Sequence, residues 1–191
     1  MTKYTESGAG LTAGKVLIYH LRDVVKTREA QGTGFRLRVP SLQIALGEKI
    51  ALIGESGCGK STLLDMLSMT LRPSEIGSFR FRPERGAEPV DICRLWRKRQ
   101  LNRLGDLRRL RIGYVMQTGG LLPYLTVREN ISLSRRLLDM PEDGMVEELA
   151  GNLGIRSQLD KLPHQLSVGE RQRVAIGRAL AHRPSIVIAD E

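Results

Sequence analysis

Cysteine is scarce in this chain of 191 residues, which has only Cys58 and Cys93. The two have no metal-ligand spacing and make no disulfide framework, so a reducing compartment fits best. No run of apolar residues is long enough to span a bilayer or to form the apolar part of a signal peptide. We therefore expect a cytoplasmic protein, unless a partner holds it at a membrane.

Aromatic residues make up 4% of the chain, whereas the net charge is +9. Such a charge fits a nucleic-acid partner, an anionic membrane surface or solubility alone. No nucleic acid is expected, because no binding motif or row of stacking aromatics accompanies the charge. The most basic segment, residues 94–111, is either an ordinary solvated helix face or a contact for anionic lipid headgroups.

The N-terminal third has the pattern of a β subdomain. Residues 1–14 predict a flexible leader, and the alternation of apolar and polar residues at 15–25 and 35–39 predicts a hairpin of strands. An unbroken apolar run at 50–53, flanked by glycine, predicts a buried parallel strand. A helix should follow from Gly59, with Leu63, Leu64, Leu67 and Met69 on its inner side.

The remaining pattern alternates strands and helices. An amphipathic helix interrupted near Gly105 is expected over 92–111. Strands are expected at 78–82, 111–116 and 185–190, and helices at 126–138, 145–153 and 170–181. This order predicts an α/β fold with an N-terminal antiparallel β subdomain and an inserted α-helical subdomain at about 118–183.

A glycine-rich motif lies between the 50–53 run and the helix that follows it. Its residues match G-x-x-x-x-G-K-[ST] in full: Gly54, Glu55, Ser56, Gly57, Cys58, Gly59, Lys60 and Ser61. Glycines let successive backbone N–H groups point at phosphate oxygens, and the helix N-terminus favours the same anion. Lys60 is expected at the β- and γ-phosphates, Ser61 at Mg²⁺ and Thr62 near the α-phosphate. The motif, a P-loop, predicts nucleotide and magnesium binding and indicates that the α/β core is of the P-loop NTPase type.

Two carboxylates end the last apolar strand, Asp190 and Glu191. An acidic residue at the tip of a strand beside the P-loop strand can hold Mg²⁺ through water, which is the role expected for Asp190. Glu191 is then placed to act as the general base for the attacking water. The alternative is that the strand merely ends in two acidic residues exposed to solvent.

A helix-opening motif near the C-terminus gives a second phosphate-binding surface. Ser167 followed by Glu170 forms a capping box, and its N–H groups and hydroxyl face outward. Residues 166–180 resemble the signature motif of ABC ATPases, which begins L-S-G-G-Q. Met116–Gln117 resembles the Q-loop of that family, and 121–130 the segment that follows it.

The resemblance covers about residues 16–191 and implies an ATPase subunit of an ABC transporter with ATP and Mg²⁺ as cofactors. It implies that Gln117 contacts Mg²⁺ and senses the γ-phosphate. It also implies a homodimer, in which Ser167, Gly169 and Glu170 of one subunit close over the ATP of the other. A transmembrane permease subunit is the other expected partner, and it would hold the chain on the cytoplasmic face of the inner membrane.

Within the family, the Glu-Arg-Gln-Arg run and the Leu-Leu-Pro stretch look most like lipoprotein-releasing and macrolide-export ATPases. A related branch is associated with type VI secretion signalling. A soluble ABC ATPase acting on nucleic acid or ribosomes is the alternative, although about 105 residues between Lys60 and the signature leave no room for a coiled coil. A GTPase is excluded by the lack of an N-K-x-D motif.

The sequence departs from the family pattern in four places. Val168 replaces a signature glycine, which is expected to strain the backbone, and Glu170 replaces the signature glutamine without expected loss. No aromatic stands at the usual adenine position, which leaves three alternatives: Arg28 lies flat on the base, Phe35 substitutes from the adjacent strand, or adenine is held loosely. The D-loop and switch histidine are missing after Glu191, so we expect weak hydrolysis from the chain as it stands.

Overall fold

The computed structural model describes residues 15–30 and 33–190, in two compact units, 1–104 and 105–191. The predicted leader at 1–14 and the predicted base Glu191 lie outside the described residues. No helix in the described part is both long and apolar enough to cross a membrane. Each unit is considered by itself.

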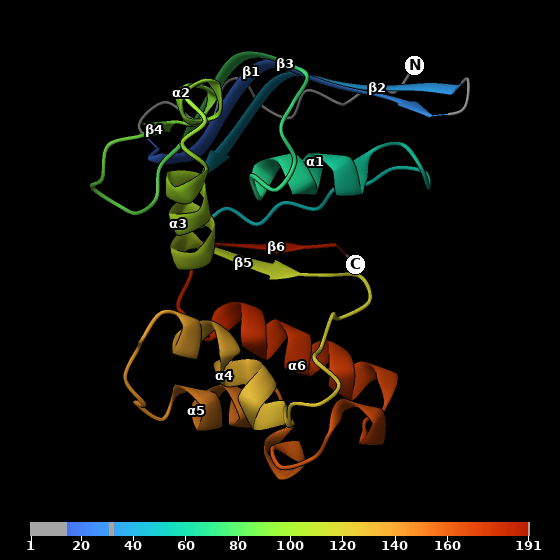
Figure 1. The fold of residues 1–191 in the computed structure, drawn as a ribbon, viewed down its shortest axis with the longest axis vertical. Helices are drawn as coiled ribbons and strands as arrows, with labels where there is room; N and C mark the ends of the chain where they lie inside the picture. Colours follow the sequence, from blue (N-terminus) through green and yellow to red (C-terminus); the bar gives the residue numbers. More distant parts are fainter. Residues whose placement is uncertain (1–14, 31–32, 191) are drawn as a thin grey trace. The chain divides into compact units, whose positions relative to one another are not determined.

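The first unit contains a four-stranded antiparallel sheet with the order β2-β1-β3-β4 (Figure 1). Its strands are β1 (Leu17–Ala30), β2 (Thr33–Ala45), β3 (Glu75–Phe81) and β4 (Val90–Asp91). The predicted hairpin is confirmed, with strands longer than the alternation alone indicated. In β2 the arginines 36 and 38 are exposed and Leu37 and Val39 are buried, as expected of a half-buried strand.

The few aromatic residues are concentrated in the core of this unit. The ring of Tyr19 lies 4.9 Å from that of Phe81, and the ring of Phe79 lies 5.6 Å from that of Trp96, measured between centroids. The buried Tyr19 hydroxyl donates a 2.7 Å hydrogen bond to the Leu67 carbonyl oxygen. This bond attaches the end of helix α1 (Lys60–Leu67) to the sheet.

The predicted buried strand at 50–53 is wrong. Among the described residues it forms no strand and joins no ladder, and the side chain of Ile53 is 93% exposed. A strand exists only where a neighbour supplies hydrogen bonds. None of the described strands pairs with this run, so its apolar character alone does not produce a strand.

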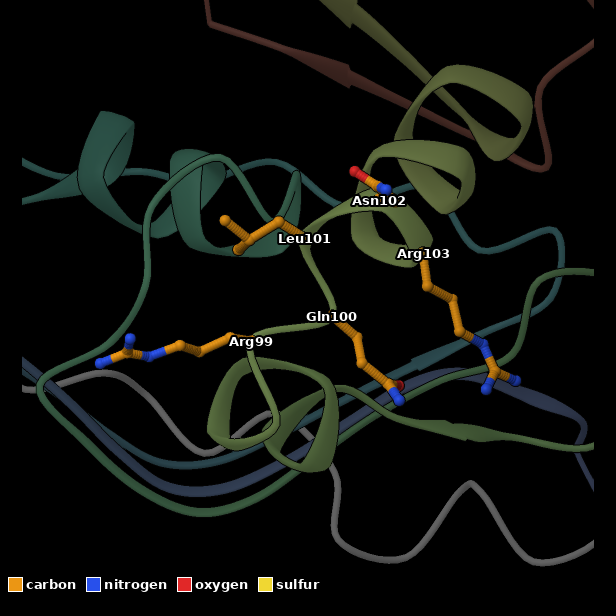
Figure 2. A pocket seen from close by; sticks show the side chains of 5 residues that line it. All are labelled: Arg99, Gln100, Leu101, Asn102 and Arg103. Carbon is orange, nitrogen blue, oxygen red and sulfur yellow. The ribbon is translucent and has the colours of Figure 1, made fainter.

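The predicted interruption of the basic helix is misplaced. The segment forms two helices, α2 (Ile92–Arg97) and α3 (Leu101–Arg111), and the chain turns at Lys98–Gln100 instead of at Gly105. Arg99 lies in this turn with φ 51° (Figure 2). Gly105 is accommodated inside α3, since glycine only weakens a helix.

In the second unit two parallel strands, β5 (Ile112–Val115) and β6 (Ile186–Ala189), pair in register from Ile112 with Ile186 to Val115 with Ala189. The strand predicted at 185–190 is therefore present, but it is not buried throughout, because Val187 is 43% exposed. Three helices accompany them: α4 (Val127–Leu137), α5 (Met145–Asn152) and α6 (Val168–Leu180).

The helices of the second unit enclose one apolar cluster. Val127 and Ile131 of α4, Ala150 of α5 and Val174 of α6 are all fully or almost fully buried in it. Two short 3₁₀ turns, at Arg156–Gln158 and Pro163–Gln165, connect α5 to α6. The α/β class is thus confirmed. The boundary between the two units falls inside α3, whereas the helical subdomain limits of 118–183 stay a prediction.

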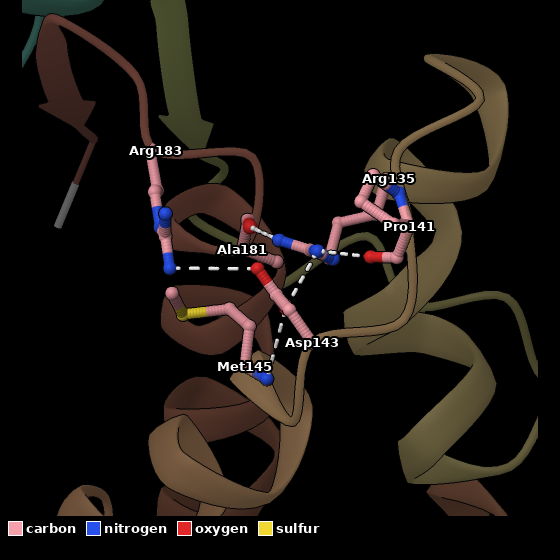
Figure 3. Close-up of polar contacts among 6 residues, drawn as sticks. All are labelled: Arg135, Pro141, Asp143, Met145, Ala181 and Arg183. Carbon is pink, nitrogen blue, oxygen red and sulfur yellow. Dashed lines mark hydrogen bonds and ion pairs between the residues drawn. The ribbon is translucent and has the colours of Figure 1, made fainter.

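A buried arginine ties the α4–α5 connection to the end of α6 (Figure 3). Arg135, 4% exposed, donates hydrogen bonds to the carbonyl oxygens of Ala181 (3.0 Å) and Pro141 (2.5 Å) and to Asp143 Oδ1 (2.7 Å). Arg183 approaches the other Asp143 oxygen at 3.5 Å. Because the guanidinium is planar with five donors, one side chain satisfies all three acceptors.

Candidate functional site

The glycine-rich motif of the first unit forms a loop that runs directly into α1. Gly57 and Gly59 have φ values of 79° and 105°, a backbone region that side chains disfavour. Lys60 curls back across the loop, and its Nζ donates to the carbonyl oxygens of Gly54 (2.8 Å) and Glu55 (2.9 Å). The ammonium is therefore held over the loop at the start of the helix.

The N-terminus of α1 fits an anion. Its N-cap, Gly59, offers no side chain to cap the helix, and no acidic residue lies in the first turn. The helix dipole and the N–H groups of this turn consequently favour a phosphate from outside the chain. Ser61 is exposed and Thr62 half-buried beside them, so Lys60, Ser61 and Thr62 are together at this helix start.

The two residues predicted to stack on adenine are neighbours. Arg28 of β1 lies directly opposite Phe35 of β2 in the hairpin register, and partners in such a pair share a face of the sheet. The Phe35 ring contacts the loop, since it lies 2.9 Å from where a Cβ at Gly59 would be. Phe35 is half-buried and Arg28 exposed.

In the second unit, Gln117 and Asp190 follow the carboxyl ends of the two parallel strands. The Asp190 N–H donates a 3.0 Å hydrogen bond to the Val115 carbonyl oxygen, which extends the ladder by one step beyond β6. Gln117 is exposed and Asp190 half-buried at this edge. An amide and a carboxylate are oxygen ligands that suit Mg²⁺.

No group of three or more His, Cys, Asp or Glu able to hold a metal lies in the part of the chain that the structure describes. The residues predicted to bind magnesium are Ser61 in the first unit and Gln117 and Asp190 in the second, whereas Glu191 lies outside the described residues.

The capping box predicted at the signature is confirmed. Ser167 Oγ accepts a 3.3 Å hydrogen bond from the Glu170 N–H, and Glu170 Oε2 accepts a 2.7 Å bond from the Ser167 N–H. These bonds, together with the charges of Lys161 and Arg173, lower the pKa of Glu170 below its ordinary value. Glu170 is therefore a carboxylate that orders the helix start, and the exposed Gly169 lies just before it in the first turn of α6.

Val168 does not strain the signature. It begins α6, it is absent from the positive-φ residues, and its side chain is 73% exposed. The expectation that this residue would need an unusual backbone angle is wrong, because the first turn of a helix accepts a β-branched residue.

Two polar residues of the site were missed by the sequence analysis. Asn130, fully buried, accepts from the Leu122 N–H and donates to the carbonyl oxygens of Leu122, Leu125 and Thr126. Arg178 donates to the carbonyl oxygens of Gly119 and Gly120, which follow Gln117 closely in the chain. A polar residue at an inward helix position was the available signal for both.

A glycine loop whose lysine crosses it at an uncapped helix N-terminus defines a phosphate-binding protein of the P-loop class. The family model for ABC transporters matches residues 37–191. The chain therefore belongs to the ABC transporter family and is an ATP-binding domain of that family.

Curated relatives and solved structures agree with this assignment. The chain is 38% identical over 154 residues to the glycine betaine/carnitine/choline transport ATP-binding protein OpuCA of Bacillus subtilis, covering 78% of this chain and 37% of that protein. It is 39% identical over 158 residues to the lipoprotein-releasing system ATP-binding protein LolD of Maricaulis maris, covering 81% and 64%. The chain thus spans between about a third and two thirds of the length of these relatives.

Among solved structures, the fold is similar to MJ0796, described as a bacterial ABC transporter cassette in dimeric form. The TM-score is 0.78 at 30% identity, covering 91% of this chain and 73% of that one. A second similar structure is cbiO1 from Clostridium perfringens, part of the ABC transporter complex cbiONQ. Its TM-score is 0.72 at 28% identity, covering 93% and 66%.

Proposed function

We propose that this chain binds and hydrolyses Mg-ATP and thereby powers a separate membrane permease. The observation that carries the proposal is Lys60, held by two carbonyl oxygens over a glycine loop at the uncapped start of α1. Exchanging these carbonyl oxygens for phosphate oxygens gives the ammonium a charged partner, which makes the stronger hydrogen bond. The bound nucleotide supplies the phosphoanhydride bond whose cleavage releases energy.

The predicted site residues have separate roles in this proposal. Lys60 neutralises phosphate charge, Ser61, Gln117 and Asp190 supply oxygens for magnesium, and Glu191 takes a proton from water. Arg28 and Phe35 are the candidates for holding adenine. The support for Phe35 is its contact with the loop, since a ring already packed on Gly59 loses little freedom on stacking.

The signature helix would serve a second copy of the chain. Ser167 and Gly169 present hydroxyl and N–H donors at the start of α6, and these would close over the triphosphate bound by the partner copy. The similarity to a dimeric cassette supports this arrangement. A homodimer with two shared nucleotides is the functional state that we propose.

For the transport system, we propose the lipoprotein-releasing or export type, which includes cell-envelope and type VI secretion signalling. The Glu-Arg-Gln-Arg run at 170–173 supports it, and so does the LolD relative, of which the chain covers 64%, against 37% of OpuCA. Co-purification of the protein from membranes should then bring an untagged permease. Recovery of ribosomes or nucleic acid in its place would favour the soluble ATPase.

Binding of a fluorescent ATP analogue tests the proposal directly. Lys60→Ala should abolish binding, because the loop loses its only cationic side chain. Lys49→Ala is the matched control, since Lys49 is exposed and lies just before the loop; it should bind as the unchanged protein does. Unchanged affinity in Lys60→Ala would overturn the assignment of the loop.

A further inference from the structure

Five basic side chains and one leucine form an exposed surface around the turn between α2 and α3. Arg94, Arg97, Lys98, Arg99 and Arg103 are all exposed, and Leu101 among them is 64% exposed. We call these six residues the basic patch. They lie entirely in the first unit, away from the residues assigned to phosphate binding in the chain.

The patch is presented by a fixed support. The opposite side of α2 is buried, with Ile92 and Cys93 at or below 1% exposure and Trp96 packed edge-on against Phe79. Arg94 lies three and four positions before Arg97 and Lys98, so these three cations share one face of the helix. Burial of one face therefore forces the basic face outward.

The positive charge of the patch is not neutralised by any ion pair within the described part of the chain. None of its five cations forms an ion pair with any residue that the structure describes, whereas Arg36, Arg38 and Arg128 each pair with a carboxylate. The two acids nearest in sequence have other partners: Asp91 accepts the Arg94 N–H as the N-cap of α2, and Asp106 pairs with Arg109 at 3.0 Å. Clustered like charges repel one another, so an anionic partner would relieve this repulsion.

The exposed leucine indicates which anion fits. Figure 2 shows Leu101 and Arg99 projecting to the same side of the turn, next to a shallow hollow of about 540 Å³ that residues 99–103 line. Arg103 projects to the other side in the same view. An apolar side chain beside an arginine suits a bilayer interface, where the leucine enters the acyl boundary and the guanidinium group stays with phosphates. Single-stranded nucleic acid prefers aromatic platforms, and Trp96 is only 5% exposed.

We propose that the basic patch is a docking surface for the anionic headgroups of a phospholipid bilayer. The contact belongs to this chain itself and needs neither a permease nor a nucleotide. It would hold the protein at the membrane surface and so raise its local concentration around any membrane partner.

Sedimentation with vesicles tests the proposal. The protein should bind vesicles of phosphatidylcholine with phosphatidylglycerol but not phosphatidylcholine alone, and binding should weaken as salt is added. Each lost charge is expected to weaken partitioning about fivefold, so the triple variant Arg97→Gln, Lys98→Gln, Arg99→Gln should bind on the order of 100-fold more weakly. Thermal unfolding checks that the variants remain folded.

The matched control removes the same charge elsewhere. Arg85, Arg136 and Arg156 are exposed and lie outside the patch; the triple glutamine variant there should keep most of the vesicle binding. Equal losses in the two triple variants would mean that net charge alone matters and would overturn the proposal. Absence of binding to anionic vesicles by the unchanged protein would do the same.

Leucine 101 separates a bilayer from other polyanions. Leu101→Trp should show an emission shift to shorter wavelength with anionic vesicles, and Lys60→Ala should still bind them because the patch acts without nucleotide. A Leu101→Trp emission that stays unchanged with vesicles, or binding of RNA at lower protein concentration than vesicles, would overturn a bilayer as the occupant.

Discussion

The guanidinium of Arg178 fastens Gly120 to the signature helix. Arg178 Nη1 donates a 2.8 Å hydrogen bond to the Gly120 carbonyl oxygen, and Nη2 donates one of 2.8 Å to that of Gly119. Both glycines have positive φ, 71° at Gly119 and 55° at Gly120. The segment that follows Gln117 is therefore shaped by the same helix that begins at Ser167.

Replacing Arg178 should loosen this segment. Arg178→Ala leaves two carbonyl oxygens without their donors and should lower the free energy of unfolding by about 1–3 kcal/mol. Hydrogen exchange at 117–121 should speed up, and urea unfolding gives the stability. Arg178→Lys keeps the charge but cannot reach both oxygens in a planar arrangement. The stability and exchange rate of Arg178→Lys should therefore lie between those of Arg178→Ala and of the unchanged protein. Exchange as slow as in the unchanged protein for both variants would contradict the prediction.

Gly59 should tolerate no side chain. Gly59→Ala combines φ 105° with a methyl group 2.9 Å from the Phe35 ring, and we expect a loss of about 1–3 kcal/mol in unfolding free energy. Nucleotide affinity should fall about tenfold or more, which corresponds to about 1.4 kcal/mol. Calorimetry with ATP measures the second effect.

Gly151 provides the control for this substitution. It lies in α5, and no atom is within 4 Å of where its Cβ would be. Gly151→Ala should leave nucleotide affinity unchanged and raise the unfolding free energy by up to about 1 kcal/mol. If Gly59→Ala behaves in the same way, the tight contact with Phe35 has no influence on binding.

Two capping boxes of the same design allow structure and function to be separated. Thr126 with Glu129 caps α4 as Ser167 with Glu170 caps α6. Thr126→Ala and Ser167→Ala should each cost about 1 kcal/mol of stability. Only Ser167→Ala should also impair ATP-driven dimerisation, measured by light scattering in a Glu191→Gln background. Equal dimerisation of both variants would remove Ser167 from the proposed nucleotide contact.

The Arg135 network should make stability depend on acid pH. Burial alone would raise the pKa of Asp143, but the Met145 N–H, the Arg135 guanidinium and the Arg183 charge together hold it below the ordinary 3.8. A carboxyl with a lowered folded pKa stabilises the fold above its unfolded pKa, and this stabilisation is lost as the pH falls through the folded value. Asp143→Asn should therefore lower the melting temperature at pH 7.

The difference between Asp143→Asn and the unchanged protein should shrink below pH 3.8, which thermal unfolding at several pH values would show. Asp139→Asn serves as the comparison, because Asp139 is exposed and outside the network. A melting temperature of Asp143→Asn that stays equally depressed at every pH would show that packing, not charge, is responsible.

Local signals in the sequence predicted much of this structure. The hairpin, four helices, the β5 and β6 strands and the capping box at Ser167 follow from periodicity, glycine and cap residues within a few positions. The glycine loop was recognised because the spacing of its glycines and lysine is what a backbone that surrounds phosphates requires.

Features that depend on distant partners were missed. The 50–53 run has the composition of a strand, but pairing is a tertiary property that composition does not contain. The turn at Lys98–Gln100 is another case, since burial of Trp96 and Leu104 on the two helices decides where the chain bends. Asn130 and Arg178 donate to carbonyl oxygens 8 and 58 residues away, and a polar residue at an inward helix position does not indicate which partner it binds.

The outer edge of the sheet offers little to another strand. β2 is the edge strand, 13 residues long, and Pro40 within it lacks the N–H that an added ladder would need. Arg36 and Arg38 place exposed positive charge along the same strand. Copies of this chain can thus be present at high concentration without their hairpins joining edge to edge, so amyloid-type aggregation is discouraged by the strand itself.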